Sequence, residues 1–79
     1  MEIPIEQVTL MEVKNDGQTL VLIDGRELNV DPGDFPTAIL WLPSTLLEIS
    51  ETDTDPLFDL RVKVYGTHEE IHASWSLSV

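Results

Sequence analysis

Apolar and polar residues alternate strictly in two segments near the carboxyl end of the chain. In residues 58–65 every even position is apolar, and in residues 70–79 every odd position from Ile71 is apolar. Successive side chains of a strand point to opposite faces, so this period of two predicts two amphipathic β-strands. A hairpin loop of four residues is expected between them, pairing Tyr65 with Glu70.

Two turn signals divide the amino-terminal half into three further strands. Asn15–Gly17 is typical of a three-residue loop that sets Lys14 opposite Gln18, and Asp24–Gly25 is typical of a two-residue hairpin turn. This register places a set of apolar side chains on one face: Met11, Val13, Val21, Ile23, Leu28 and Val30. We expect that face to form the core, because a one-residue slip is costly where one face is buried.

The middle of the chain is less regular. Pro32 and Pro36 predict an exposed loop, since proline cannot pair in a central strand. The apolar run at residues 38–42 is predicted to be a strand, which either ends there or continues to residue 49. A run of this length is also compatible with a helical turn, and Thr45 with Glu48 forms a capping-box pattern.

Together these segments predict an all-β fold of five or six antiparallel strands in a meander or a partly open barrel. The expected strands are residues 6–14, 18–23, 26–30, 38–42, 58–65 and 70–79. A chain of 79 residues supports one domain, residues 1–79, in which roughly 60% of the unfolded surface becomes buried. In so thin a core, Trp41 and Trp75 are expected to serve mainly as packing.

The charge of the chain limits what it can bind. Fifteen acidic and four basic side chains give a formal net charge of −11. Phosphate backbones require clusters of Lys and Arg, so we expect neither direct nucleic-acid binding nor attraction to anionic lipid. Such a field speeds encounter with another protein that has a basic surface, and by itself it also serves solubility. We predict a small non-enzymatic accessory or adaptor domain that binds another protein, and the alternative is an acidic inhibitor that mimics nucleic acid.

Cysteine is absent, and the first ten residues carry acidic side chains where a signal peptide needs basic ones. Apolar segments fall short of the roughly 18 residues that span a bilayer. These features predict a cytoplasmic protein that does not enter the membrane.

The stretch His68–His72, "HEEIH", matches the H-E-x-x-H pattern of zinc proteases. That pattern binds zinc on a helix, where the two His share one face and the intervening Glu acts as general base. The alternation from Ile71 onward favours a hairpin instead, with His68 in the turn and His72 on the solvent face of a strand. Zinc hydrolysis is therefore not predicted.

A second metal pattern also fails. Glu51, Asp53 and Asp55 alternate like the first ligands of a calcium loop, but Pro56 stands where such a loop needs Gly and Val62 where it needs a carboxylate. The sequence also has no Gly-rich phosphate loop and no nucleophile elbow. We therefore predict no metal, no cofactor and no enzymatic activity.

The chosen register leaves Leu10, Leu20 and Leu22 on the face opposite the expected core. Cross-strand apolar neighbours rimmed by polar groups tend to mark interaction sites, so these leucines are the candidate partner-binding residues. The partner that binds these leucines would be a second copy of the chain, forming a homodimer, or a larger protein. The alternative is that the 38–42 segment folds over them and makes a second small core.

Overall fold

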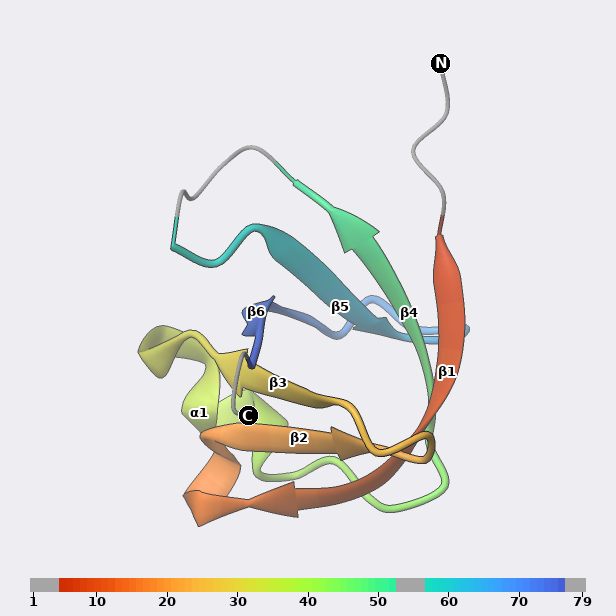
Figure 1. Ribbon diagram of the computed structural model, residues 1–79, viewed down its shortest axis with the longest axis horizontal. Coiled ribbons are helices and arrows are strands. Elements are labelled where there is room, and N and C mark those ends of the chain that lie inside the picture. Colours follow the sequence, from red (N-terminus) through yellow and green to blue (C-terminus); the bar gives the residue numbers. More distant parts are fainter. Residues whose placement is uncertain (1–4, 53–56, 77–79) are drawn as a thin grey trace.

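Six antiparallel strands close into a barrel in the computed structural model, which describes residues 5–52 and 57–76 (Figure 1). The strands are β1 (Glu6–Lys14), β2 (Thr19–Leu22), β3 (Glu27–Val30), β4 (Leu46–Glu51), β5 (Leu60–Val64) and β6 (Glu70–Trp75). Their order around the barrel is β1-β2-β3-β6-β5-β4, and β1 pairs with β4 to complete the ring. Each strand is thus hydrogen-bonded on both sides, which removes the exposed edges of an open sheet. The predicted all-β fold is confirmed.

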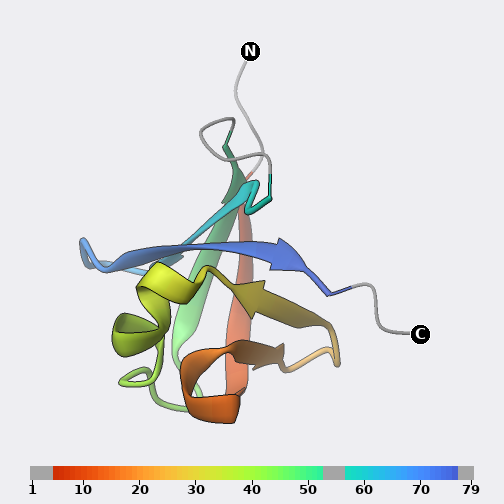
Figure 2. The same cartoon turned by 90° about the vertical axis from the view of Figure 1, so that its left-hand side faces the viewer.

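Short helical segments occupy two of the connections. The 3-10 turns η1 (Asn15–Gly17) and η2 (Pro32–Asp34) follow β1 and β3, and α1 (Phe35–Ala38) follows η2. Figure 2 shows α1 on the side of the barrel where β6 begins, whereas β6 ends on the opposite side. Within the described ranges, no helix has the length and apolar character needed to cross a membrane.

The prediction of a strand at residues 38–42 is wrong. Pro36 lies in the first turn of α1, where its missing N–H needs no partner. The chain then stays in local turns, with the amide of Trp41 donating to the carbonyl oxygen of Ala38 at 3.0 Å. Ala38 and Trp41 lie three residues apart and are both buried in the core cluster. The predicted continuation to residue 49 is real but begins at Leu46, as β4.

The first two hairpins have loops one residue longer than predicted. Lys14 pairs with Thr19 and not with Gln18, leaving a four-residue loop. Between β2 and β3, the amide of Leu22 donates to the carbonyl oxygen of Arg26, leaving three residues in the loop. A shift of one residue transfers every side chain of a strand to the other face.

The predicted partner-binding leucines therefore belong to the core. Leu10, Leu20 and Leu22 are each 0% exposed. Two residues that the sequence placed in the core lie outside it instead, since Met11 is 46% and Ile23 64% exposed. An open leucine face for docking is excluded by this burial.

A bulge in β1 explains why simple alternation failed there. The pairing with β2 shifts between Leu10, which lies opposite Leu22, and Glu12, which lies opposite Val21. A bulge inserts one extra residue, so the phase of the alternation changes along the strand. As a result both Leu10 and Val13 contact the core, although they are three residues apart.

The last hairpin keeps its predicted faces. Val62 and Ile71 pair across β5 and β6, and both are 0% exposed. The register itself differs from the prediction, because Glu70 pairs with Lys63 and not with Tyr65. This difference is an even number of residues, so every side chain stays on its predicted face.

Gly17 allows α1 to pack closely against η1. Its φ of +95° is in the region that favours glycine, and a Cβ built there would lie 2.6 Å from the carbonyl oxygen of Phe35. That distance is too short for any side chain, so only glycine fits between the two segments. Gly25 has the same φ, but nothing lies within 4 Å of its Cβ position.

The burial of the leucines can be tested with a matched pair of truncations. Leu20→Ala should lower the free energy of unfolding by about 2–5 kcal/mol, because it leaves a cavity in the core. Leu40, which is 75% exposed, is the control. Leu40→Ala should change the free energy by no more than about 0.5 kcal/mol in urea unfolding. Equal effects of the two would contradict the inward placement of Leu20.

The packing of α1 on η1 predicts a contrast between two glycines with the same φ. Gly25→Ala should cost about 1 kcal/mol, the backbone strain alone. Gly17→Ala should cost a further ~1–3 kcal/mol, because the new methyl group collides with the backbone of Phe35. Thermal unfolding followed by circular dichroism measures both. If the two variants melt together, α1 does not pack on Gly17.

Candidate functional site

The inward-facing positions of the strands end in charged and aromatic residues at one end of the barrel. On β1, Glu6 comes two residues before the buried Val8, and on β4, Glu51 comes two residues after the buried Ile49. Trp75 ends β6 on the face that carries the buried Ala73. Because side chains two apart in a strand share a face, these residues gather where the apolar core meets water. We call Glu6, Arg26, Glu51 and Trp75 the barrel mouth.

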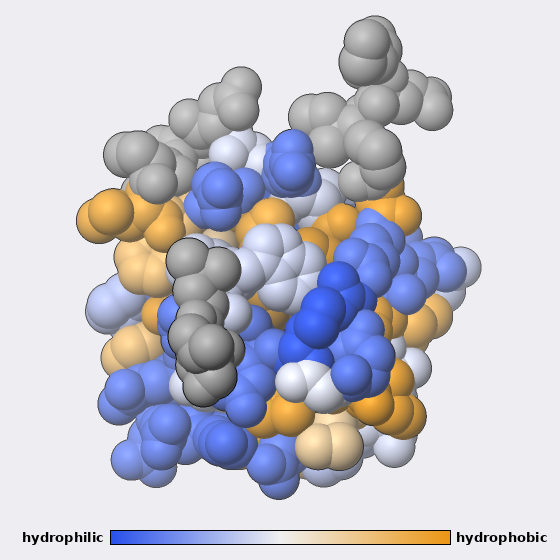
Figure 3. Space-filling view, viewed as in Figure 1, coloured by the Kyte–Doolittle hydropathy of each residue, from blue (hydrophilic) through white to orange (hydrophobic). Residues whose placement is uncertain are grey.

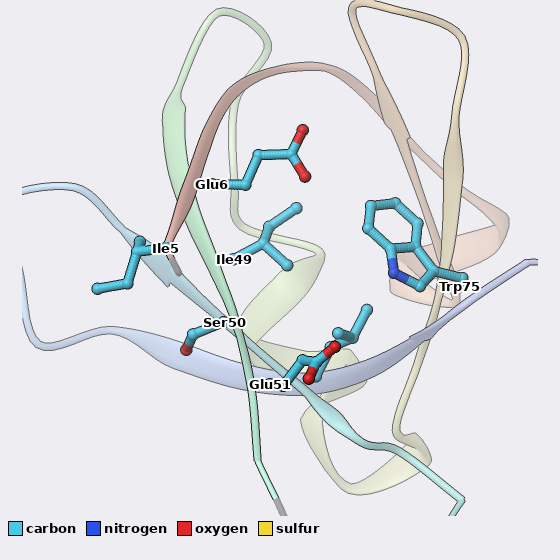
Figure 4. Close-up of a pocket in the computed structure, with 7 residues that line it drawn as sticks. Ile5, Glu6, Ile49, Ser50, Glu51 and Trp75 are labelled. Carbon is cyan, nitrogen blue, oxygen red and sulfur yellow. The ribbon is translucent and has the colours of Figure 1, made fainter. Parts of the chain in front are cut away.

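A hollow of about 420 Å³ opens at the mouth. It is lined by Ile5, Glu6, Ile49, Ser50, Glu51, Leu60 and Trp75. Ile49 and Leu60 are 4% and 3% exposed and form an apolar floor. Figure 4 shows Ile49 between the carboxylates of Glu6 and Glu51, with the Trp75 ring to one side. The hollow thus combines an aromatic wall, an apolar floor and two acidic groups.

Arg26 holds part of the mouth in place. Its guanidinium lies 4.7 Å from the centre of the Trp75 ring, a distance typical of a cation–π contact. Its Nη1 and Nη2 both donate to the carboxylate of Glu6, and its Nε donates to Asp24 Oδ2 at 2.7 Å. A second hollow of about 370 Å³ is lined by Gly25–Glu27, Trp75 and Ser76. Arg26 therefore lies beside Trp75, lines the second hollow and is bonded to Glu6 of the first.

These contacts shift two pKa values. The backbone N–H of residue 26, and then the guanidinium of Arg26, lower the pKa of Asp24 below its ordinary value by stabilising the carboxylate. The hydrogen bond to Glu6 raises the pKa of Arg26. The guanidinium of Arg26 is therefore charged, and the carboxylates of Glu6 and Asp24 already balance that charge.

Every Lys and Arg of the chain is similarly engaged. Lys14 lies 3.9 Å from Glu27, Arg61 lies 3.4 Å from Glu70 and Lys63 lies 3.8 Å from Glu48. Arg26 is the fourth, so each basic side chain has a carboxylate beside it. Figure 3 shows hydrophilic residues over much of one face of the molecule. The surface consequently offers unpaired carboxylates and no group of free cations, since all four Lys and Arg lie in the described ranges.

Glu51 is the free carboxylate of the mouth. Glu6 is bound to Arg26, whereas the side chain of Glu51 makes no hydrogen bond or ion pair with the residues that the structure describes. Asp53 and Asp55, which follow it in the rejected calcium pattern, lie outside the described residues. An acidic group beside an aromatic ring is suited to an organic cation.

The "HEEIH" stretch forms part of a hairpin, as predicted. His68 lies in the loop after β5, and His72 lies on β6 with its side chain outside the barrel core. The two His do not share a helix face, so the arrangement of a zinc protease is not formed. His72 does lie close to Asp31 and Asp34, on the outer surface of the barrel. Within the described ranges, these three residues form the group of side chains close enough together to hold a metal ion.

Sequence reasoning missed the residues of the mouth. Glu6 and Arg26 were placed in strands without a role, Glu51 was considered only in the failed calcium pattern, and Trp75 was assigned to packing. A signal was present for the three charged residues, because each stands two positions from a residue that faces the core: Val8, Leu28 and Ile49. It could be used only with the correct register, which the loop lengths had concealed.

No protein-family model, curated protein or solved structure matches the chain.

The Arg26 contacts predict how Asp24 responds to pH. The lowered pKa means that the stability contributed by these contacts is present above the ordinary carboxyl pKa and is lost as pH falls through the pKa of folded Asp24. In Arg26→Gln the pKa of Asp24 should rise but stay below its ordinary value, because the backbone N–H of residue 26 still donates to it. Carboxyl ¹³C NMR measures the shift. Lys14→Gln, which removes a distant cation, should leave Asp24 unchanged, and an equal rise there would contradict the local cause.

Proposed function

We propose that this chain is a small acidic, non-enzymatic adaptor domain that binds another protein at the barrel mouth. The partner inserts a Lys or Arg side chain into the hollow beside Trp75. This proposal is supported by three groups that line the hollow together: the Trp75 ring, the apolar Ile49 and the unpaired carboxylate of Glu51. A cation over a Trp face gains about 0.5–2 kcal/mol, and a carboxylate adds a charge-assisted hydrogen bond.

The size of the hollow supports a side chain as its occupant. About 420 Å³ is near the lower end of the range for ligand sites, roughly 300–1,000 Å³. The aliphatic part of a Lys or Arg side chain can lie on Ile49 and Leu60 while its charged end reaches Glu51. Arg26 already pairs a guanidinium with this ring inside the chain itself.

The charge of the whole chain supports a basic partner. With all four Lys and Arg paired, the net charge of −11 is uncompensated and attracts basic surfaces over long range. The same field opposes nucleic acid. It also opposes a homodimer, whose proposed leucine interface is buried in the core. A cytoplasmic location, suggested by the absence of cysteine, belongs to this proposal.

The alternative function, a mimic of nucleic acid, rests on the net charge alone. A mimic binds through many carboxylates at once, so its affinity falls steeply with salt and no single pocket residue dominates. Capture of one side chain at the mouth depends on particular groups and less on ionic strength. The two functions therefore predict different losses of binding affinity when a single carboxylate is neutralised.

The test uses short synthetic peptides with one central Arg, and matched peptides in which the uncharged analogue citrulline replaces it. In NMR titrations the Arg peptide should shift the indole N–H signal of Trp75 and leave that of Trp41, which is buried in the core, in place. The citrulline peptide should shift neither. Failure of the Arg peptide to move Trp75 would overturn the proposal.

A matched pair of charge variants separates the pocket from the general field. Glu51→Gln should weaken binding of the Arg peptide by about three- to tenfold, or ~0.7–1.4 kcal/mol. Glu12→Gln removes the same charge from an exposed position on β1 outside the hollow and should have a smaller effect. Equal losses, together with a steep dependence on salt, would favour the mimic.

A further inference from the structure

A second cluster of chemically active side chains lies on the outer surface of the barrel. Asp31 follows β3, Asp34 ends η2, and His72 lies on β6. One oxygen or nitrogen atom from each comes within 4.8 Å of the other two. We call these three residues the corner cluster. It is separate from the barrel mouth, and none of the three lines the hollow beside Trp75.

Hydrogen bonds hold the backbone of all three residues in place. The amide of Asp31 donates to the carbonyl oxygen of His72 at 2.9 Å, and the amide of Asp34 donates to the carbonyl oxygen of Asp31 at 2.8 Å. The amide of His72 donates to Asp34 Oδ2 at 2.9 Å. Residues far apart in sequence are thus fixed beside one another before any ligand arrives, which reduces the entropy lost on binding.

No Lys or Arg side chain pairs with the carboxylates of the corner cluster, and all four lie in the described ranges. The Lys and Arg side chains are all paired with other carboxylates. Arg61 lies opposite His72 in the β5–β6 pairing, but it is engaged by Glu70 at 3.4 Å. His72 Nδ1 is 3.8 Å from Asp34 Oδ2, beyond hydrogen-bond distance. The two carboxylates therefore have the His72 imidazole as their neighbour and no Lys or Arg as a partner.

We propose that the corner cluster binds a divalent transition-metal ion of the zinc type, with Asp31, Asp34 and His72 as its three protein ligands. One imidazole nitrogen and two carboxylate oxygens form a donor set that zinc accepts. The imidazole disfavours calcium and magnesium, which prefer oxygen alone. This inference does not depend on the proposed function of the barrel mouth.

The three donor atoms lie somewhat farther apart than the ligands of a bound zinc ion. Ligand atoms around one tetrahedral zinc ion lie about 3.3 Å apart, given metal–ligand distances of about 2.0–2.2 Å. The donor atoms of Asp31, Asp34 and His72 now lie up to 4.8 Å apart, so they must move closer together to bind one ion. Asp34 and His72 side chains are 27% and 34% exposed, so they can turn, and water can reach the remaining coordination position. Each carboxylate also keeps lone pairs that its hydrogen bond to the backbone does not use.

Bound metal would join β6 to the corner between β3 and η2. Asp34 and His72 are 38 positions apart in sequence, so an ion that holds both stabilises the folded chain and not the unfolded one. The melting temperature should therefore rise as the zinc concentration rises above the dissociation constant.

The test is a calorimetric titration of Zn²⁺ into chelator-treated protein, with ¹⁵N NMR of the imidazole groups. One ion per chain should bind, and the imidazole signals of His72 should shift while those of His68, in the exposed hairpin loop, should not. Calcium at the same concentrations measures non-specific attraction to an acidic chain, and it should produce no such shift. Absence of one-to-one zinc binding would overturn the proposal.

Two variants remove ligands without removing the hydrogen bonds that shape the corner. His72→Gln keeps the backbone amide, and Asp31→Asn keeps the oxygen that accepts from the amide of Gly33 at 3.0 Å. Loss of a group that only orients a ligand weakens metal binding about 10–100-fold, so each variant should weaken zinc binding at least as much. Their melts in the presence of chelator should match that of the parent.

The controls are the matched changes outside the cluster. His68→Gln removes the other imidazole, and Asp16→Asn removes one negative charge at a position with φ of +57°, which Asn tolerates. Both should bind zinc as the parent does. If either loses binding to the same extent as His72→Gln or Asp31→Asn, the ion is held by the general charge or by the "HEEIH" stretch, and the corner cluster is not the site.

Discussion

The phase of β1 is the constraint on which the rest of the barrel depends. β1 is hydrogen-bonded to β2 on one side and to β4 on the other, so its inward side chains meet those of both neighbours. The bulge between Leu10 and Glu12 lets Leu10 meet Leu22 and, further along, Val13 meet Leu20. Burial of each such side chain contributes about 1.5–3 kcal/mol, so a slip of one residue would expose much of a thin core. That penalty fixes the register of the first three strands.

The carboxyl-terminal hairpin could be predicted from the sequence, and the amino-terminal strands could be predicted only as elements. In β5 and β6 the alternation is unbroken, so Val62 and Ile71 face inward in any register that differs by an even number of residues. In β1 and β2 both faces carry aliphatic residues, and the inward face then depends on loop lengths. The residues of η1 adopt positive φ at Asn15, Asp16 and Gly17, a longer turn than the Gly signal indicates. Local patterns do not encode that difference.

The candidate sites depend still more on tertiary structure. The mouth exists because closure of the barrel brings the start of β1 beside the ends of β4 and β6, and no local pattern relates Glu6 to Trp75. The corner cluster joins His72 to Asp34 across 38 positions. The "HEEIH" pattern indicates His72 as a zinc ligand of a protease-type helix, and the hairpin excludes that helix. The actual neighbours of this histidine, Asp31 and Asp34, precede and end η2, in a segment that the sequence predicted only as a loop containing prolines.

The two ends of the barrel have opposite chemistry for one structural reason. At the end beside α1, the inward positions meet Ala38 and Trp41, and the core is covered by apolar residues. At the mouth no helix is present among the described residues, and the same alternation runs out to Glu6 and Glu51. β6 connects the proposed sites, with Trp75 on the face of Ala73 and His72 on the other face. Successive side chains of a strand point to opposite faces, so a substitution at His72 leaves the side chains of the mouth in place. The adaptor and metal proposals can therefore fail or hold separately.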